Sequence, residues 1–157
     1  MSILNWTAYF IEMARLASKR SKDPNAQIGA VVVGPKHEIR ATGYNGFPRG
    51  IDDMNQAERW RSGVKQNYVV HAETNAIVGA ARVGVPLEGC TLYTVCLPCI
   101  ECTKLILQAG IVRVVVDQVF MDQYTNSSWL TPQVERHIRA MFHEAAVSLD
   151  FVYVPNS

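Results

Sequence analysis

The chain has 157 residues, of which 48% are hydrophobic, and its 15 Lys and Arg residues nearly balance its 14 Asp and Glu residues, leaving a formal net charge of +1. A chain of this length can bury about two thirds of its unfolded surface, so we expect one domain that spans residues 1–157. The balanced charge lacks the basic excess that commonly accompanies binding to a phosphate backbone, which favours a small-molecule substrate over nucleic acid.

The N-terminal segment carries no targeting pattern. It contains Asn5 and Trp6 and lacks a basic stretch followed by an apolar core and a small-residue cleavage site. The chain also has no run of about eighteen apolar residues, the length needed to span a bilayer. We therefore expect a soluble, cytoplasmic protein with no membrane partner, in which the 4 cysteines are metal ligands or buried thiols rather than disulfides.

The first part of the chain predicts a helix followed by a β-hairpin. Apolar residues recur at helical spacing up to the break at Asp23-Pro24, which predicts a helix over residues 4–20. Residues 27–33 are apolar and β-branched, and a Gly-Pro turn then leads into a second strand that ends near Tyr44. These two strands are expected to pair as a hairpin.

The remainder of the chain begins with a loop and then alternates helices and strands. Residues 45–67 are polar and lack clear periodicity apart from a short helical segment at 56–61, so we expect an extended loop that borders a site. The elements that follow are a helix at 72–83, a strand at 91–95, a helix at 99–109, a strand at 112–116, a helix at 131–146 and a strand at 149–154. This alternation predicts a largely parallel half-sheet with helices packed on it. The expected fold is therefore α/β, a three-layer α/β/α sandwich with a five-stranded mixed sheet.

Two short segments carry residues typical of metal chemistry, His71-Ala72-Glu73 and Pro98-Cys99-Ile100-Glu101-Cys102. His71, Cys99 and Cys102 offer one imidazole and two thiolates, and three protein ligands are typical of a catalytic zinc site that leaves a position for water. The start of a helix favours thiolates, and a proline is tolerated in its first turn. Residues two apart do not share a helix face, so His71 must lie at or before the first turn for Glu73 to approach the same metal.

A structural zinc site is the alternative interpretation of these ligands. Such a site is usually closed by a fourth protein ligand, and no second C-x-x-C or H-x-x-H pair is available. Cys96 is the nearest substitute, but Cys90 and Cys96 are better interpreted as small buried hydrophobic residues. The spacing H-x-E followed by P-C-x-x-C is instead the signature of zinc nucleobase deaminases, in which the glutamate moves protons and does not bind the metal.

With these residues identified, the chain resembles the deoxycytidylate (dCMP) deaminases of the zinc-dependent cytidine/deoxycytidylate deaminase superfamily. The resemblance covers most of the chain up to about Val116 and depends on four blocks, Ser21-Lys22-Asp23-Pro24-Asn25, Gly43-Tyr44-Asn45-Gly46-Phe47-Pro48, His71-Ala72-Glu73-Thr74-Asn75-Ala76-Ile77 and Leu105-Ile106-Leu107-Gln108-Ala109-Gly110-Ile111. The second block is the most discriminating, because free-nucleoside and tRNA deaminases are not expected to carry it.

The resemblance implies a cytidine-deaminase-like fold and the hydrolytic deamination of dCMP to dUMP and ammonia, a step of pyrimidine nucleotide biosynthesis that supplies thymidylate synthesis. It implies Zn²⁺ held by His71, Cys99 and Cys102, with Glu73 as the catalytic proton carrier. It also implies a homohexamer that dCTP activates and dTTP inhibits, each triphosphate acting with Mg²⁺. Arg82 is expected at the subunit contact near the effector site, together with Tyr44 and Gly46.

Substrate contacts are expected from several polar and aromatic residues. The resemblance assigns Asn45 to the deoxyribose or phosphate, although a tight turn that closes a strand would also explain this asparagine. A phosphate needs donors beyond one amide, and the candidates are Lys22, Asn25 and Arg49. An aromatic residue after the penultimate strand should stack on the pyrimidine, and Phe120 is nearer the expected place than Tyr124.

Three other functions are alternatives to dCMP deamination. A bifunctional dCMP/dCTP deaminase fits the same residues. A polynucleotide deaminase would need a basic groove that the composition does not suggest, and a non-catalytic scaffold protein would have no use for Glu73. Gly79 stands where some relatives have an aromatic residue tied to effector response, which predicts weak activation by dCTP.

Overall fold

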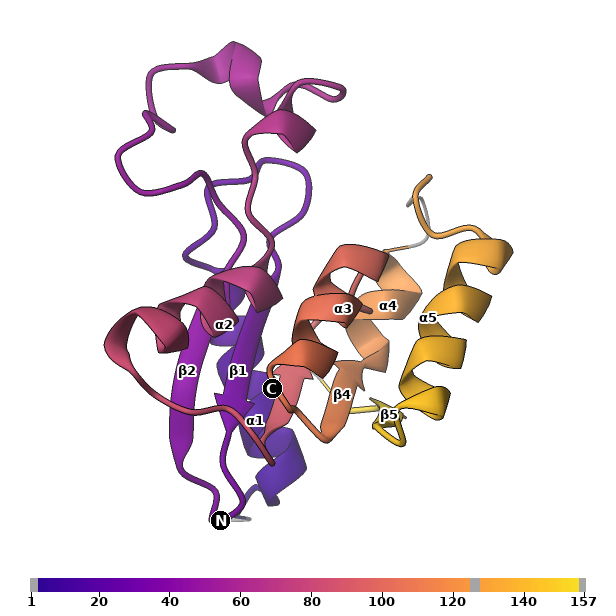
Figure 1. The fold of residues 1–157 in the computed structure, drawn as a ribbon. Helices are drawn as coiled ribbons and strands as arrows, with labels where there is room; N and C mark the ends of the chain where they lie inside the picture. The colour runs from indigo at the N-terminus through magenta and orange to yellow at the C-terminus, as the bar shows by residue number, and fades with distance from the viewer. Residues whose placement is uncertain (1–2, 125–127, 156–157) are drawn as a thin grey trace.

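The computed structural model describes residues 3–124 and 128–155. Its centre is a five-stranded sheet with strand order β2-β1-β3-β4-β5, covered by helices on both faces (Figure 1). The strands are β1 (Gly29–Val33), β2 (Ile39–Tyr44), β3 (Thr91–Thr94), β4 (Arg113–Asp117) and β5 (Ser148–Val152). The helices are α1 (Trp6–Ser18), α2 (Ala72–Val83), α3 (Ile100–Gln108), α4 (Gln118–Gln123) and α5 (Pro132–Glu144), with short 3₁₀ helices η1 (Ala57–Trp60) and η2 (Lys65–Asn67).

The sheet is mixed, as predicted. Strand β1 pairs antiparallel with both β2 and β3, whereas β3, β4 and β5 are parallel. Every residue of β1 is buried, because helices lie on both of its faces. The sequence of a strand in that position is typically a continuous run of apolar residues. The predicted hairpin, the parallel half-sheet and the α/β/α sandwich are therefore confirmed.

Two apolar cores hold the layers together, one on each face of the sheet. On one face, α2, α3 and α5 pack through residues such as Ala76, Ile106 and Phe142. On the other face, α1 packs through Phe10 and Ile11. Figure 1 shows α2 and α3 in front of the sheet and α1 behind it. No helix in the described ranges is long and apolar enough to cross a membrane.

The contact between α2 and β2 is unusually close and depends on Gly43. A Cβ atom at this position would lie 2.1 Å from the carbonyl oxygen of Ala72 and 2.6 Å from the amide nitrogen of Ala76. Only a residue without a side chain allows the two backbones to approach this closely. Gly43 therefore sets the position of the first turn of α2, the part of the helix next to His71.

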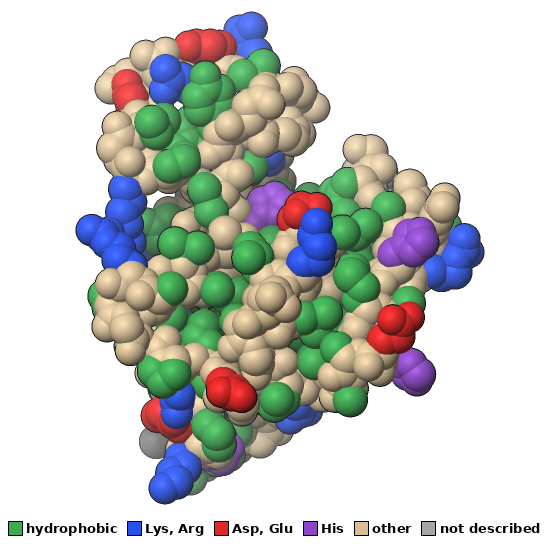
Figure 2. Space-filling view, viewed as in Figure 1, with side chains coloured by type: hydrophobic (Ala, Val, Ile, Leu, Met, Phe, Trp, Pro, Cys, Tyr) green, Lys and Arg blue, Asp and Glu red, His purple; other side chains and the backbone are tan. Residues whose placement is uncertain are grey.

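Residues 46–70 form an arm that projects beyond the sheet (Figure 1), and Figure 2 shows a hollow between this arm and the rest of the molecule. The amide and carbonyl groups of Gly46 and Val70 pair with each other at the base of the arm, at 3.1 and 2.8 Å. Inside the arm, Phe47 stacks on Trp60 with ring centroids 4.2 Å apart and also contacts Tyr68. The arm is thus an extension with its own small aromatic core, and it leads directly into His71.

Two short elements were not predicted. Helix α4 directly follows β4, and the side chain of Asp117 caps it by accepting a hydrogen bond from the amide of Val119. A six-residue helix is too short for a periodic apolar pattern to stand out. The second is η2 in the arm, whereas η1 lies within the predicted short helical segment at 56–61.

Candidate active site

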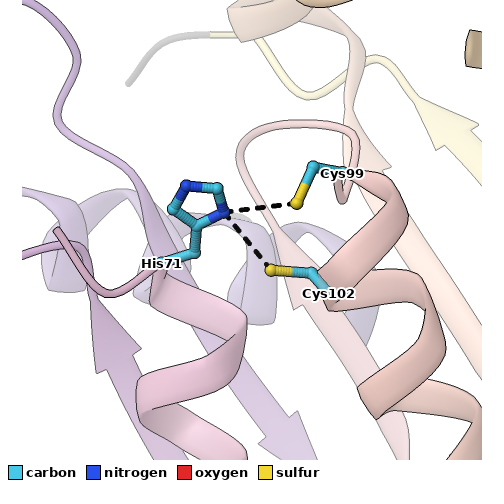
Figure 3. A group of neighbouring side chains, drawn as sticks. All are labelled: His71, Cys99 and Cys102. Carbon is cyan, nitrogen blue, oxygen red and sulfur yellow. Dashed lines mark hydrogen bonds between the residues drawn. The ribbon is translucent and has the colours of Figure 1, made fainter. Parts of the chain in front are cut away.

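His71 lies at the start of α2, as its N-cap. Its backbone is extended, with φ −71° and ψ 157°, so it stands just outside the helix, while Glu73 is in the first turn. This arrangement confirms the geometric condition that His71 must lie at or before that turn. Its imidazole points toward the start of α3, where both cysteines lie (Figure 3).

Cys99 and Cys102 present their sulfur atoms on one side of the start of α3. Cys99 is the N-cap and Cys102 lies in the first turn. Pro98 precedes the cap and lies outside the helix, whereas a position in the first turn was expected. The Nδ1 atom of His71 lies 3.3 Å from Cys99 Sγ and 3.4 Å from Cys102 Sγ (Figure 3).

These three ligand atoms suit a zinc ion. They all lie within 4.8 Å of one another, and tetrahedral zinc with ordinary bond lengths would place nitrogen and sulfur about 3.6 Å apart. Cys102 is buried, Cys99 is half-buried and His71 is exposed. The cluster is therefore closed on its protein side and open on the other, as expected for a site that leaves a position for water.

The electrostatics of the cluster favour a thiolate. The hydrogen bond between the two cysteines lowers the pKa of the Cys99 thiol to about 4 and raises the pKa of Cys102. The hydrogen bond to Cys99 raises the pKa of His71. Negative charge therefore collects on the Cys99 sulfur, and a bound cation would deprotonate the Cys102 thiol as well.

Glu73 stands beside the cluster without belonging to it. Its side chain is 3% exposed, and burial raises the pKa of its carboxyl group. Its Oε1 atom lies 3.2 Å from the hydroxyl of Thr94, at the end of β3. A buried carboxyl group whose pKa is shifted toward neutrality is suited to taking up and returning protons.

A cavity of about 300 Å³ opens in front of His71, Glu73 and Cys99. The other residues that line it come from the arm, the loop before β1, the ends of β2 and α2 nearest the site, the segment between β3 and α3, and the segment after α4. Tyr124 and Trp129 supply aromatic surface, and Asn45, Asp23 and Lys65 supply polar groups. The volume is at the lower end of the range for small-molecule sites.

Comparison with known proteins places the chain in a family. Residues 4–118 match the profile of the cytidine and deoxycytidylate deaminase zinc-binding region. The chain belongs to this family. His71, Cys99 and Cys102 are accordingly its zinc site.

Individual relatives in the family include deoxycytidylate deaminases from animals and phages. The enzyme from Homo sapiens is 40% identical over 152 residues, which cover 92% of this chain and 78% of the relative. The enzyme from Mycobacterium phage D29 is 37% identical over 126 residues, or 73% of this chain and 96% of the relative. A crystal structure of dCMP deaminase from cyanophage S-TIM5, in complex with dCMP and dUMP, superimposes with a TM-score of 0.72 at 23% identity, covering 97% of this chain and 100% of that chain. At this identity the structural match shows the shared fold.

Asn45 lies in the wall of the cavity, 5% exposed, and its amide is engaged by the protein. Its Nδ2 donates to the carboxylate of Asp23 at 3.1 Å and to the carbonyl of Ala26 at 2.8 Å, while its Oδ1 accepts from the amide of Ile28 at 2.8 Å. Asn45 thus braces the loop before β1 against the end of β2. The structure brings it to the site in a supporting position, with one lone pair of Oδ1 left for another partner.

The other predicted substrate residues lie farther out. Lys22 is exposed and forms an ion pair with Asp53 at 2.7 Å, outside the cavity. Asn25 and Phe120 line an adjoining hollow that shares Asp23, Ala26 and Tyr124 with the first. Phe120, on α4, lines that hollow, and the aromatic residues that line the cavity are Tyr124 and Trp129.

The residues predicted for subunit and effector contacts lie away from the cavity. Arg82 is exposed in the last turn of α2, and Tyr44 is 40% exposed at the end of β2. Gly46 forms the base of the arm by pairing with Val70. Their contact with a second subunit or an effector stays a prediction.

Lys65 is a site residue that sequence reasoning missed. Its Nζ lies 2.6 Å from Asp23 Oδ2, and the two side chains are 16% and 0% exposed. The residues are 42 positions apart, and nothing in the polar sequence of the arm distinguishes this lysine from its neighbours. The signal that the sequence offers is Asp23 itself, because a carboxylate that becomes buried normally needs a positively charged partner.

Proposed function

We propose that this protein is a zinc-dependent hydrolase that converts dCMP and water into dUMP and ammonia. The observation that carries the proposal is a three-ligand cluster, His71, Cys99 and Cys102, beside the buried carboxyl group of Glu73 at the wall of one small cavity. The similarity to deoxycytidylate deaminases supports the choice of nucleotide.

Glu73 is the residue that moves protons in this reaction. Zinc, when bound, supplies a water that is acidic enough to act as a nucleophile near neutral pH. Glu73 accepts a proton from the attacking water and delivers it to the ring nitrogen N3 of cytosine, while C4 gains the oxygen. Glu73 then takes the second proton from the hydroxyl group on C4 and passes it to the amino group. The C4–N bond breaks, ammonia leaves, and C4 keeps the oxygen as a carbonyl. The raised pKa of Glu73 suits both directions of transfer.

The remainder of the cavity would orient the nucleotide. Tyr124 and Trp129 offer aromatic faces to the pyrimidine ring. Lys65 is the ammonium group in the wall, and we assign the 5′-phosphate to it. Asp23 can release part of its interaction with Lys65, because the amides of Asn25 and Ala26 also donate to its carboxylate, at 2.9 and 3.2 Å. Asn45 would offer its free lone pair to the deoxyribose.

The test is the release of ammonia from four compounds compared under one condition: dCMP, dCTP, deoxycytidine and a cytosine-containing oligonucleotide. Turnover of dCMP well above the other three is expected. Comparable rates on dCMP and dCTP would favour the bifunctional enzyme, and a preference for the oligonucleotide would favour the polynucleotide deaminase. No release from any of the four would contradict the proposal.

The proposal extends to regulation and assembly. We infer a cytoplasmic homohexamer that supplies dUMP for thymidylate synthesis and is inhibited by dTTP with Mg²⁺. Helix α2 links the expected effector contact at Arg82 to Glu73 on one rigid element. Gly79, on the same helix, has open space around its Cβ position and no side chain to pass on a packing change. The response to dCTP is therefore expected to be weak.

Two measurements test this extension. Sedimentation should give a mass near six chains, and a dCMP saturation curve should be recorded with Mg²⁺ alone, with dCTP and with dTTP. Strong sigmoidality that dCTP abolishes would contradict the weak activation, and indifference to dTTP would contradict the inhibition. The cytoplasmic location is proposed because Cys99 and Cys102 must be thiolates to bind zinc, and a reducing compartment keeps them from forming a disulfide.

A further inference from the structure

Thr94 contacts Glu73 from a buried position at the end of β3. Its side chain is 0% exposed. Its Oγ1 lies 3.2 Å from Glu73 Oε1 and 3.2 Å from the carbonyl oxygen of Cys96. The residue is neither a zinc ligand nor part of the cavity lining. Its hydroxyl therefore meets two acceptors in a place that water does not reach.

The hydrogen-bonding capacity of this group decides what it can do for Glu73. A threonine hydroxyl has one proton to donate and two lone pairs. When Glu73 is ionised, Thr94 can donate to Oε1. When Glu73 carries a proton, Thr94 can donate to the Cys96 carbonyl instead and accept from the carboxyl group. The hydroxyl can thus hold Glu73 in both of its protonation states by rotating about one bond.

The link between Thr94 and Glu73 joins two separate elements of the fold. Among the described residues, Thr94 is the side chain that hydrogen-bonds the Glu73 carboxyl group. Thr94 lies on β3, next to the segment that leads to Cys99, whereas Glu73 lies on α2. The hydroxyl therefore fixes the carboxyl group relative to the sheet.

From this geometry we propose that Thr94 is a positioning residue for Glu73. It holds Oε1, which leaves the other carboxylate oxygen of Glu73, a residue of the cavity wall, for proton transfer to a bound pyrimidine. This inference depends on the proposed function only in naming Glu73 as the proton carrier. Thr94 itself does not touch the substrate, and its effect is exerted through the carboxyl group.

The experiment compares Thr94→Val, which removes the hydroxyl at almost constant volume, with Thr94→Ser, which keeps it. Thr103→Val is the matched control, because Thr103 is also fully buried and its hydroxyl has no hydrogen-bond partner in the described structure. For each variant, zinc content, melting temperature, and kcat and KM for dCMP are measured.

Thr94→Val is expected to keep its zinc and a KM within about 3-fold of the parent, while kcat falls by about 10- to 100-fold, part of what a positioned acid or base contributes. Thr94→Ser should recover most of kcat, and Thr103→Val should match the parent. Unchanged kcat in Thr94→Val, an equal loss in Thr94→Ser, or loss of zinc from Thr94→Val would each overturn the positioning role.

A crystal structure of zinc-loaded Thr94→Val gives a readout that does not depend on the substrate. We expect the Glu73 carboxylate to turn away from its position in the parent protein, and an unmoved carboxylate would refute the proposal. If the parent protein fails to deaminate dCMP, the proposed function is wrong, whereas the position of Glu73 in the variant still tests Thr94.

Discussion

Gly43→Ala is the change that most directly tests how the fold positions the site. The added Cβ would lie 2.1 Å from Ala72 O and 2.6 Å from Ala76 N, and real Cβ atoms essentially never come within 3.0 Å of a heavy atom outside their own and the adjacent residues. Both neighbours are backbone atoms and cannot rotate away. Strand β2 and helix α2 must therefore separate by about 1 Å, and α2 carries Glu73 and follows His71.

The expected consequences follow from this displacement. Overpacking of a tight contact usually costs about 1–3 kcal/mol, and the upper end applies here because backbone must move. A misplacement of about 1 Å between catalytic groups can lower the rate by about 10²-fold. We expect the free energy of unfolding of Gly43→Ala to fall by about 2–3 kcal/mol, and kcat/KM for dCMP to fall by at least about 10-fold. Urea denaturation and ammonia release measure the two effects.

Two further glycines provide controls. Gly29→Ala would place Cβ 2.1 Å from Ala14 O and 2.4 Å from Ser18 N on α1, which carries no zinc ligand. It should lose similar stability with a much smaller loss of activity. Gly79→Ala, in open space on α2, should raise stability by about 0.5–1 kcal/mol. The contact between β2 and α2 at Gly43 would not be what positions the site if Gly43→Ala kept kcat/KM near the parental value. The same conclusion would follow if Gly29→Ala lost as much kcat/KM as Gly43→Ala.

Four further predictions concern the metal and the cavity. Cys102→Ala should hold less than about a tenth of the zinc of the parent, measured by metal analysis, and should unfold at a lower temperature in calorimetry. Full zinc occupancy in this variant would mean that the ligands lie elsewhere. Glu73→Gln should keep zinc and bind dCMP but lose at least about 10²-fold in turnover, and near-parental turnover would require another base. Lys65→Met should raise KM for dCMP by about 10-fold or more while deoxycytidine kinetics change little; equal changes for both compounds would exclude a phosphate contact. Lowering the pH should release zinc, detected with a chelating dye, because protons compete for the thiolates and the imidazole. Retention of zinc well below pH 4, where the Cys99 thiol is itself protonated, would contradict this ligand set.

The order of elements and the zinc ligands could be predicted from the sequence because both depend on local information. Cys99 and Cys102 lie within one helical turn, so their spacing alone puts both sulfur atoms on one side. The apolar, β-branched stretches and the helical periodicities determined the hairpin and the parallel half-sheet, since each element carries its own pattern. Short elements such as α4 escaped because six residues are too few to show a period.

The wall of the cavity was decided by tertiary structure. Lys65 and Asp23 are 42 positions apart, and Thr94 and Glu73 are 21 apart on different elements, so no spacing rule connects either pair. The same holds for the aromatic wall, where Phe120 lines only the adjoining hollow and Tyr124 reaches the cavity. Residue types and their spacing along the chain thus determined which residues bind zinc. The packing of α2 on Gly43 and the contact of the arm with the loop before β1 decided which side chains face the substrate. The physical reason is that contacts between distant segments depend on how whole elements pack, and that information is spread over the entire core.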